Sequence, residues 1–303
     1  MSDPTPLPVR TLDSCVACGS VTLRPLPLVY EFSGTFPLVE CDDCGLRFLR
    51  VQPVGEGLAA LYSAAYFESD FRCGRSDVAY ASEDVFRAEN EGLLDAFERR
   101  GARGRLLELG SAGGWLLKHA RERGWQAQGV ELSADAAERS LALGLEVFQG
   151  DLLSATLPAD SFDLVYMGDV LEHVPDCQAV LVEAARLLRT GGHLYLRGPI
   201  TTNSLARRLA LALYRALGRT IVLREPPYHL WEFTPGPLEH LFASAGLEVI
   251  TSRQSKIPPG RVHGEKSGLQ RLAMGAMDAL NLPLTRLLNA AGDRIVMVGR
   301  KQE

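Results

Sequence analysis

Three acidic residues stand where expected strands give way to loops, and they are the residues best placed to bind a ligand. Glu108 lies two residues before the first glycine of "ELGSAGGW", where its carboxylate would repel a pyrophosphate and attract a cation. Glu131, in "VELS", stands 21 residues after Gly110 and is placed to accept hydrogen bonds from both hydroxyls of a ribose. Asp151, in "GDL", can accept a hydrogen bond from an exocyclic amine such as that of adenine. One such acid alone would be read as a helix cap or a loop charge, but three on consecutive strand ends indicate a ligand site.

The elements that must position these acids alternate between strands and helices over residues 105–199. Strands are expected at 105–110, 126–133, 145–151, 162–168 and 193–199, and helices at 113–124, 134–144 (capped by Ser133) and 176–192. Strict alternation with short glycine-rich joints predicts a parallel sheet covered by helices on both faces. Ligands of such sheets bind at the carboxyl ends of the strands, where the three acids are expected. The predicted fold class is therefore α/β, with a Rossmann-like sheet.

Four of the six cysteines form two matched pairs, "CVACG" and "CDDCG". Two intervening residues let both thiolates of a pair reach one tetrahedral ion, and the following glycines, Gly19 and Gly45, can turn backbone N–H groups toward the sulfurs. Disulfides are the alternative, but they need an oxidising compartment that nothing else in the sequence supports. The pattern predicts a small N-terminal zinc ribbon whose ion is structural, because four thiolates leave no open position for catalysis. The predicted ligands are Cys15, Cys18, Cys41 and Cys44, with Cys73 and Cys177 as ordinary thiols.

Composition and charge narrow the class of protein. The 303 residues are 46% hydrophobic and 23% charged, and 37 Asp and Glu against 32 Lys and Arg give a net charge of −5. This acidic balance argues against a broad nucleic-acid-binding face. The start "MSDPTPLPVR" lacks the apolar core of a signal peptide, and the most apolar run, at 209–214 between arginines, is too short to span a membrane. We expect a soluble, cytoplasmic protein.

The stretches "LLELGSAGG", "GVELS", "QGDLL", "FDLVYMGDVLEHV" and "LLRTGGHLYLRGP" resemble, in order and spacing, the class I S-adenosylmethionine-dependent methyltransferases. The resemblance covers residues 105–250 and includes "GDRIVMVGRK" as the last strand of a Rossmann-like methyltransferase sheet. One departure is Ala112, where the family usually has glycine; alanine is the smallest replacement, so donor binding should survive. The donor-binding residues that the resemblance implies are Glu108, Gly110, Ser111, Ala112, Gly113, Gly114, Glu131, Leu132, Asp151, Leu152, Met167 and Asp169.

The cysteine pairs, "LYSAAYFES" and "PPYHLWEFTPGPLEHLFASAGLEV" resemble a subgroup that includes C-methyltransferases of nucleotide-linked keto-deoxysugars. That likeness implies a zinc ribbon at 1–55, a helical linker and lid at 56–100, and a methyltransferase domain at 101–303 with acceptor-site insertions at 201–235 and 255–291. It implies a small-molecule acceptor, S-adenosylmethionine and structural zinc, no nucleic acid, no transmembrane segment, and a monomer or homodimer. An rRNA methyltransferase and a non-catalytic donor-binding scaffold remain alternatives, and Glu108 disfavours a nicotinamide dehydrogenase.

Two histidines are candidates for a base that takes a proton from the acceptor. His173, in "DVLEHV", is expected just after the fourth strand on the methyl side of the pocket. His229, in "PPYHLWEF", lies in the segment where such enzymes build the acceptor site. Each could instead be a structural histidine. Tyr62 and Tyr66 could cover the pocket, although aromatic residues at this spacing more often belong to a core.

Two further segments have apolar residues at helical spacing. Residues 201–224 also carry arginines, and this helix could clamp a phosphorylated acceptor, rest on a membrane surface or simply cover the core. Residues 267–292 form the second segment, which Pro283 is expected to divide into two helices and which could dimerise, touch lipid or pack.

Overall fold

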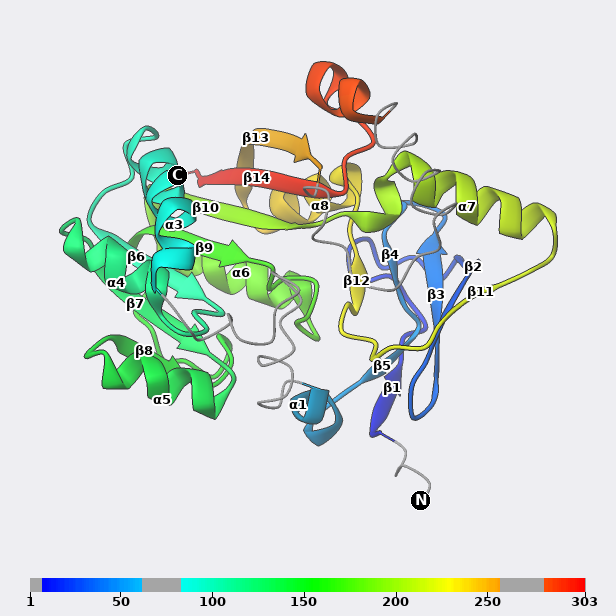
Figure 1. Ribbon diagram of the computed structural model, residues 1–303, viewed down its shortest axis with the longest axis horizontal. Helices are drawn as coiled ribbons and strands as arrows, with labels where there is room; N and C mark the ends of the chain where they lie inside the picture. Colours follow the sequence, from blue (N-terminus) through cyan, green and yellow to red (C-terminus); the bar gives the residue numbers. More distant parts are fainter. Residues whose placement is uncertain (1–6, 62–82, 257–280, 303) are drawn as a thin grey trace.

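A seven-stranded sheet is the main element of the computed structural model, which describes residues 7–61, 83–256 and 281–302 (Figure 1). Its strand order is β13-β14-β10-β9-β6-β7-β8. The strands are β6 (Arg105–Leu109), β7 (Gln126–Glu131), β8 (Glu146–Gln149), β9 (Phe162–Gly168), β10 (Leu188–Pro199), β13 (Leu247–Ser255) and β14 (Arg294–Lys301). β6 to β10 run parallel, and β14 lies antiparallel to both β10 and β13. The predicted α/β Rossmann-like fold is confirmed.

Helices cover both faces of this sheet. They are α3 (Glu83–Glu98), α4 (Trp115–Glu122), α5 (Ala134–Ala142), α6 (Cys177–Leu187) and α8 (Pro235–Ser244). Neighbouring residues of β6 point to opposite faces, so Leu106 packs in a core with Phe97 of α3, while Leu107 joins a core with Leu181 of α6. All seven residues of β9 are buried, as expected of a central parallel strand; Asp163 near its start is the one charged residue among them. This double covering holds the carboxyl ends of the strands rigid.

The helix expected at 176–192 was predicted too long. In the structure α6 ends at Leu187, and β10 already begins at Leu188 instead of residue 193. The pairing of β10 with β9 is irregular between Leu188 and His193, and Gly191 there has φ 77°. Glycine takes this left-handed conformation without strain, which lets an extended but irregular segment replace the last helical turn.

A five-stranded sheet, in the order β11-β2-β3-β4-β12, carries the N-terminal part of the chain. Its strands are β2 (Leu23–Glu31), β3 (Thr35–Cys41), β4 (Arg47–Leu49), β11 (Ile221–Leu223) and β12 (Trp231–Glu232). A two-stranded pair, β1 (Val9–Thr11) and β5 (Val51–Pro53), lies beside it, and α1 (Glu56–Leu61) follows. Two strands from the C-terminal half, β11 and β12, complete this sheet by pairing with β2 and β4.

The basic segment after β10 forms a helix, as its apolar spacing predicts. After a 3₁₀ turn (Thr201–Asn203), α7 spans Leu205–Ala216, and the Ser204 hydroxyl accepts a hydrogen bond from Arg207 N at 3.4 Å. Residues 281–288 are helical and include Pro283. Residues 257–280 lie outside the described parts of the chain, as do Cys73, Tyr62 and Tyr66. Among the described helices, none is long and apolar enough to cross a bilayer.

Candidate active site

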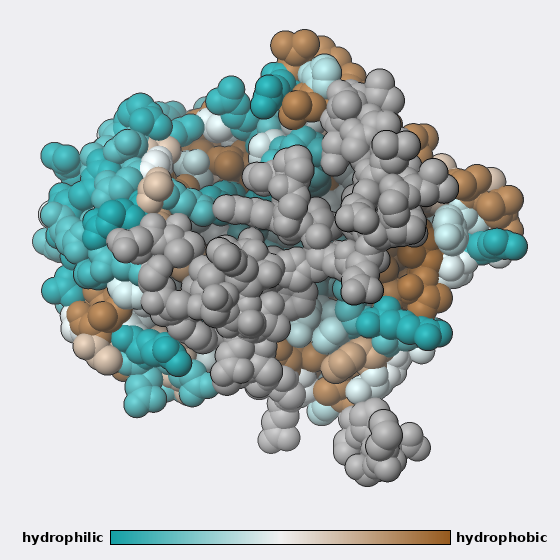
Figure 2. Space-filling view, in the orientation of Figure 1, coloured by the Kyte–Doolittle hydropathy of each residue, from teal (hydrophilic) through white to brown (hydrophobic). Residues whose placement is uncertain are grey.

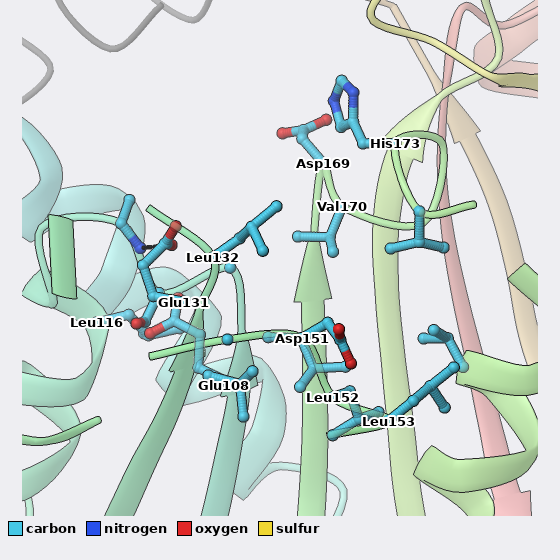
Figure 3. Close-up of a pocket in the computed structure, with 18 of the residues that line it drawn as sticks. Glu108, Leu116, Glu131, Leu132, Asp151, Leu152, Leu153, Asp169, Val170 and His173 are labelled. Atoms are coloured by element: carbon cyan, nitrogen blue, oxygen red, sulfur yellow. Dashed lines mark hydrogen bonds between the residues drawn. The ribbon is translucent and has the colours of Figure 1, made fainter. Parts of the chain in front are cut away.

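A cavity of about 380 Å³ opens at the carboxyl ends of β6, β7 and β9 (Figure 3). This volume lies in the range of about 300–1,000 Å³ that small-molecule sites occupy. Nine of the predicted donor-binding residues line it: Glu108, Gly110, Ser111, Ala112, Glu131, Leu132, Asp151, Leu152 and Asp169. The parallel sheet thus brings together residues from four separate loops, as the rule for ligands of such sheets requires.

The glycine turn after β6 has a shape that only small residues allow. Gly110 has φ 69°, and a Cβ there would lie 2.5 Å from Cγ2 of Val170. Gly114 begins α4 with φ 77°, and its Cβ would lie 2.5 Å from Leu145 Cδ1. Ala112 also has a positive φ, of 46°, which costs an alanine roughly 1–2 kcal/mol relative to glycine. The turn therefore adopts a left-handed conformation at Ala112 as well as at Gly110 and Gly114.

Glu131 connects the turn to the end of β7. It is 5% exposed; one carboxylate oxygen accepts a hydrogen bond from Ala112 N at 2.8 Å and the other from Ser133 N at 2.8 Å. These contacts hold the carboxylate at the cavity wall, where Figure 3 shows it beside Glu108. Asp151 is exposed at the end of the next strand, with Oδ1 accepting a hydrogen bond from Ser154 N at 2.8 Å. Glu131 and Asp151 therefore both line the cavity while they accept hydrogen bonds from nearby backbone N–H groups.

Some residues differ from their predicted placement. Gly113, Gly114 and Met167 are not among the residues that line the cavity, and Met167 is fully buried in the core beneath it. The cavity wall also includes Phe86 and Asn90 of α3, which the sequence analysis assigned only to a linker and lid. Asn90 is 8% exposed and its Nδ2 lies 3.2 Å from Nδ1 of the buried His119. In the sequence, Asn90 could have been recognised as a polar residue on the apolar side of an amphipathic helix.

One end of the cavity gathers ionisable side chains. Figure 3 shows Asp169 and His173 close together there, and both line the cavity. Asp169 has φ 57° and accepts a hydrogen bond from Arg294 Nη2 at 2.6 Å. The ring of His229 lies 5.0 Å from that of His173, centroid to centroid, although His229 is not itself among the cavity-lining residues. Ligand atoms of Glu172, His173 and His229 all lie within 4.8 Å of one another.

Each of the two histidines has a polar partner that positions its ring. Nδ1 of His173 lies 2.8 Å from the carbonyl oxygen of Tyr228, so the hydrogen bond between them leaves Nε2 as the nitrogen that can serve as base. Nδ1 of His229 lies 3.8 Å from Glu232 Oε1, and Glu232 also accepts a hydrogen bond from Thr201 Oγ1 at 2.8 Å. His229 keeps 30% of its side-chain surface accessible, so its ring is not enclosed in the core.

Burial and neighbouring charges set the pKa values of this group. Burial, followed by the charge of Asp169, raises the pKa of Glu172 to about 7. Burial lowers the pKa of His229, but the carboxylates of Glu232 and Glu172 outweigh it, so the net effect is a raised pKa. For Glu232 burial raises the pKa, and the hydrogen bond and charge of His229 outweigh it and lower the pKa overall. Groups that can exchange protons near neutral pH therefore adjoin the cavity.

The N-terminal sheet supports the segment that carries His229. Leu49 N donates to Leu230 O at 3.0 Å, and Gln52 Nε2 donates to the same oxygen at 3.3 Å. Leu230 N in turn donates to Glu172 O at 2.8 Å, which fixes the segment against the loop that bears His173. The Trp231 ring lies 5.7 Å from Phe48 of β4, centroid to centroid. The sheet with the cysteine pairs thus supports the end of the cavity at which the ionisable side chains gather.

The four paired cysteines converge. Their Sγ atoms all lie within 4.8 Å of one another, and Cys15–Cys44 and Cys18–Cys41 are each separated by 3.5 Å. Four thiolates about 2.3 Å from one tetrahedral zinc lie about 3.8 Å apart, so this donor set fits zinc. Gly19 and Gly45 have φ 74° and 76°, and their N–H groups donate to the carbonyls of Cys15 and Cys41. These are two closed turns of the kind that present thiolates to a metal.

The electrostatics of the cysteines agree with metal binding. Burial raises the pKa of Cys41, but N–H groups of Cys44 and Asp43 and the Cys18 thiol outweigh it and lower that pKa to about 7. Burial raises the pKa of Cys15 to about 11, so without a cation these thiols would not all ionise at neutral pH. Cys177 is buried in the main core, apart from the cluster.

The fold and this cavity define the class of α/β proteins that bind a nucleoside-containing donor at the carboxyl edge of a parallel sheet. The chain belongs to the methyltransferase domain family, which residues 81–252, more than half of the chain, match. It carries the domain of an S-adenosylmethionine-dependent methyltransferase. The enzyme class predicted from sequence is confirmed, and with it S-adenosylmethionine as the methyl donor.

Relatives and solved structures agree with this assignment. A ubiquinone biosynthesis O-methyltransferase of Cupriavidus pinatubonensis is 26% identical over 161 residues, which cover 49% of this chain and 62% of that protein. The corresponding protein of Xanthomonas axonopodis pv. citri is 31% identical over 48% of this chain and 63% of its own length. The chain thus spans less than two thirds of these relatives. A methyltransferase structure from Archaeoglobus fulgidus matches 78% of this chain and 98% of its own with a TM-score of 0.51 at 18% identity, which supports the fold.

Proposed function

We propose that this methyltransferase modifies a small molecule that loses a proton on methylation, such as a hydroxylated metabolite or a nucleotide-linked sugar. The observation that carries the proposal is the group of ionisable side chains at one end of the cavity, around His173 and His229. The curated relatives named above are O-methyltransferases of a small-molecule pathway, which supports an oxygen acceptor. The four-cysteine cluster, in this proposal, holds a structural zinc.

The donor would be held by the residues around the glycine turn. Gly110 and Ala112 allow close approach of the backbone, Glu131 would accept hydrogen bonds from the ribose, and Asp151 would accept one from the adenine amine. S-adenosylmethionine, when bound, supplies a methyl group activated by a sulfonium. Glu108 and Asp169 place negative charge at the cavity wall, which favours a cationic ligand.

The residues at the other end would handle the proton. His173 or His229 would take the proton that the acceptor atom loses when it is methylated. The backbone carbonyl of Tyr228 orients the first ring, and Glu232 stabilises the protonated form of the second. We favour His229 as the base and His173 as the residue that orients the acceptor.

The test is incubation of the purified protein with methyl-labelled donor and a panel of hydroxylated aromatic compounds, nucleotide-linked sugars and RNA. Label in a small molecule supports the proposal. Label in RNA, together with RNA binding that weakens steeply with salt, would instead establish the rRNA alternative. The acidic net charge of −5 favours the first outcome.

Replacing Glu131 with alanine should weaken S-adenosylmethionine binding by about 2–3 kcal/mol, the scale of hydrogen bonds to a charged group. The loss combines the ribose contacts with the support that the carboxylate gives to Ala112 N. Calorimetric titration of both proteins with the donor measures it. Asp135→Ala removes an exposed carboxylate from the nearby first turn of α5 and should leave affinity unchanged. Equal affinities for all three proteins would remove Glu131 from the donor site.

The rate should rise with pH through a pKa above the usual histidine value of about 6.5, because the raised pKa of His229 delays formation of the neutral base. Glu232→Gln keeps the shape and an acceptor for Thr201 but removes the charge closest to His229. The acidic limb of the kcat profile should then move to lower pH. A limb that stays in place would show that His229 does not set it.

A further inference from the structure

Helix α7 exposes an apolar stripe that no other described element covers. Leu209, Leu213 and Leu217 are 52%, 56% and 57% exposed, and their four-residue spacing aligns them along one side of the helix. A different side of α7 faces β2, where Leu211 is only 6% exposed. Packing on the sheet therefore explains why α7 carries an apolar residue at Leu211. It does not explain the apolar residues at the three exposed positions.

The same stretch is strongly basic. Residues 201–224 contain five arginines and no aspartate or glutamate, in a chain whose net charge is −5. Arg208 and Arg215 are exposed and, at seven residues apart, form a second stripe beside the leucines. Arg219 is exposed just beyond the end of the helix. An exposed leucine stripe flanked by arginines matches the helices that lie in the plane of a membrane surface.

A second helix adds to this surface. In residues 281–288, Leu287 and Leu288 are 82% and 68% exposed, and Arg286 beside them is exposed as well. Asn203, in the turn before α7, donates to the carbonyl of Gly292 at 3.1 Å. This contact places the start of α7 near the segment that follows the helix at 281–288. Figure 2 shows brown, apolar surface along both helices.

A bilayer fits this surface better than a second copy of the chain. Pairing α7 with its own copy would bring arginines of both chains together without a carboxylate in residues 201–224 to compensate them. An anionic lipid surface instead attracts each arginine, while the leucines enter the boundary between headgroups and acyl chains. We propose that α7 and the helix at 281–288 form a face that binds the surface of an anionic bilayer.

The test is co-sedimentation of the full chain with vesicles. The protein should sediment with vesicles of equal parts phosphatidylcholine and phosphatidylglycerol, less so as salt rises, and should stay in solution with phosphatidylcholine alone. Removing the charges of Arg208, Arg215 and Arg219 together by substitution with glutamine should weaken binding about fivefold per arginine, or about a hundredfold. Leu213→Ser should weaken it about tenfold.

Matched controls separate this surface from general charge and hydrophobicity. Leu141 on α5 is 52% exposed, and Leu141→Ser should bind vesicles like the unchanged protein. All variants should keep the donor affinity and melting temperature of the parent, because the changed side chains are exposed. Equal sedimentation with both vesicle types, or unchanged binding of the arginine and leucine variants, would overturn the proposal. So would a lipid-free dimer, seen by light scattering, that Leu213→Ser dissociates.

Discussion

Alanine at His229 should reduce turnover on the true acceptor about 10²–10⁴-fold, the usual contribution of a positioned general base. The reason is geometric as well as electrostatic: the ring lies 5.0 Å from that of His173 at the end of the cavity, and Glu232 stabilises its protonated form. The initial rate with labelled donor, at saturating donor and acceptor, measures the effect. His173→Ala should cause a smaller loss of kcat and a larger rise in the acceptor KM, because we assign it to orientation of the acceptor.

Donor affinity separates a chemical role from a structural one. Both alanine variants should bind S-adenosylmethionine nearly as the parent does, since neither ring belongs to the glycine turn or the ribose contact. His240→Ala is a suitable control, because that histidine is exposed and its Nε2 lies 3.2 Å from the carbonyl oxygen of Ala17, apart from the two candidate bases. Near-parental turnover by both His229→Ala and His173→Ala would show that no histidine is the base. The enzyme would then act by proximity on an acceptor that is already nucleophilic.

Serine at Cys41 should abolish metal binding and unfold the N-terminal sheet. Purified protein should contain one zinc per chain, and structural zinc sites contribute about 10–16 kcal/mol to the folded state of small metal-binding peptides. Loss of one thiolate breaks the tetrahedral set of Cys15, Cys18, Cys41 and Cys44. Elemental analysis of protein purified under reducing conditions without chelator measures the zinc, and limited proteolysis reports the order of the sheet.

The same substitution should lower turnover, because Leu49 of the N-terminal sheet bonds to the segment that carries His229. Cys177→Ala is the matched control, because that thiol is also buried but lies apart from the cluster. The Cys177→Ala protein should contain as much zinc as the parent. Absence of zinc from the unchanged protein would refute the metal site. Retention of zinc by Cys41→Ser would refute its ligand set.

Local patterns in the sequence were sufficient for the fold class and for nine of the residues that line the cavity. Alternating apolar strands and helices implied a parallel sheet, because each period reports which face of an element is buried. Glu108, Glu131 and Asp151 could then be placed at one edge, since all parallel strands end on the same side. The clustering of the four paired cysteines could also be predicted from sequence, because a metal needs its ligands at short, fixed spacings.

Only tertiary contacts determine how the side chains are arranged at the end of the cavity that carries the two histidines. The sequence named His173 and His229 separately, but a hydrogen bond between His173 and Tyr228, 55 residues away, brings the two rings together. Strands β11 and β12 join the sheet of the N-terminal strands β2, β3 and β4, and Asn90 enters the cavity wall from α3. Residue types and spacings report what a segment buries but not which distant segment covers it. Pairing between distant segments depends on complementary shape and backbone hydrogen bonds that have no period in the sequence.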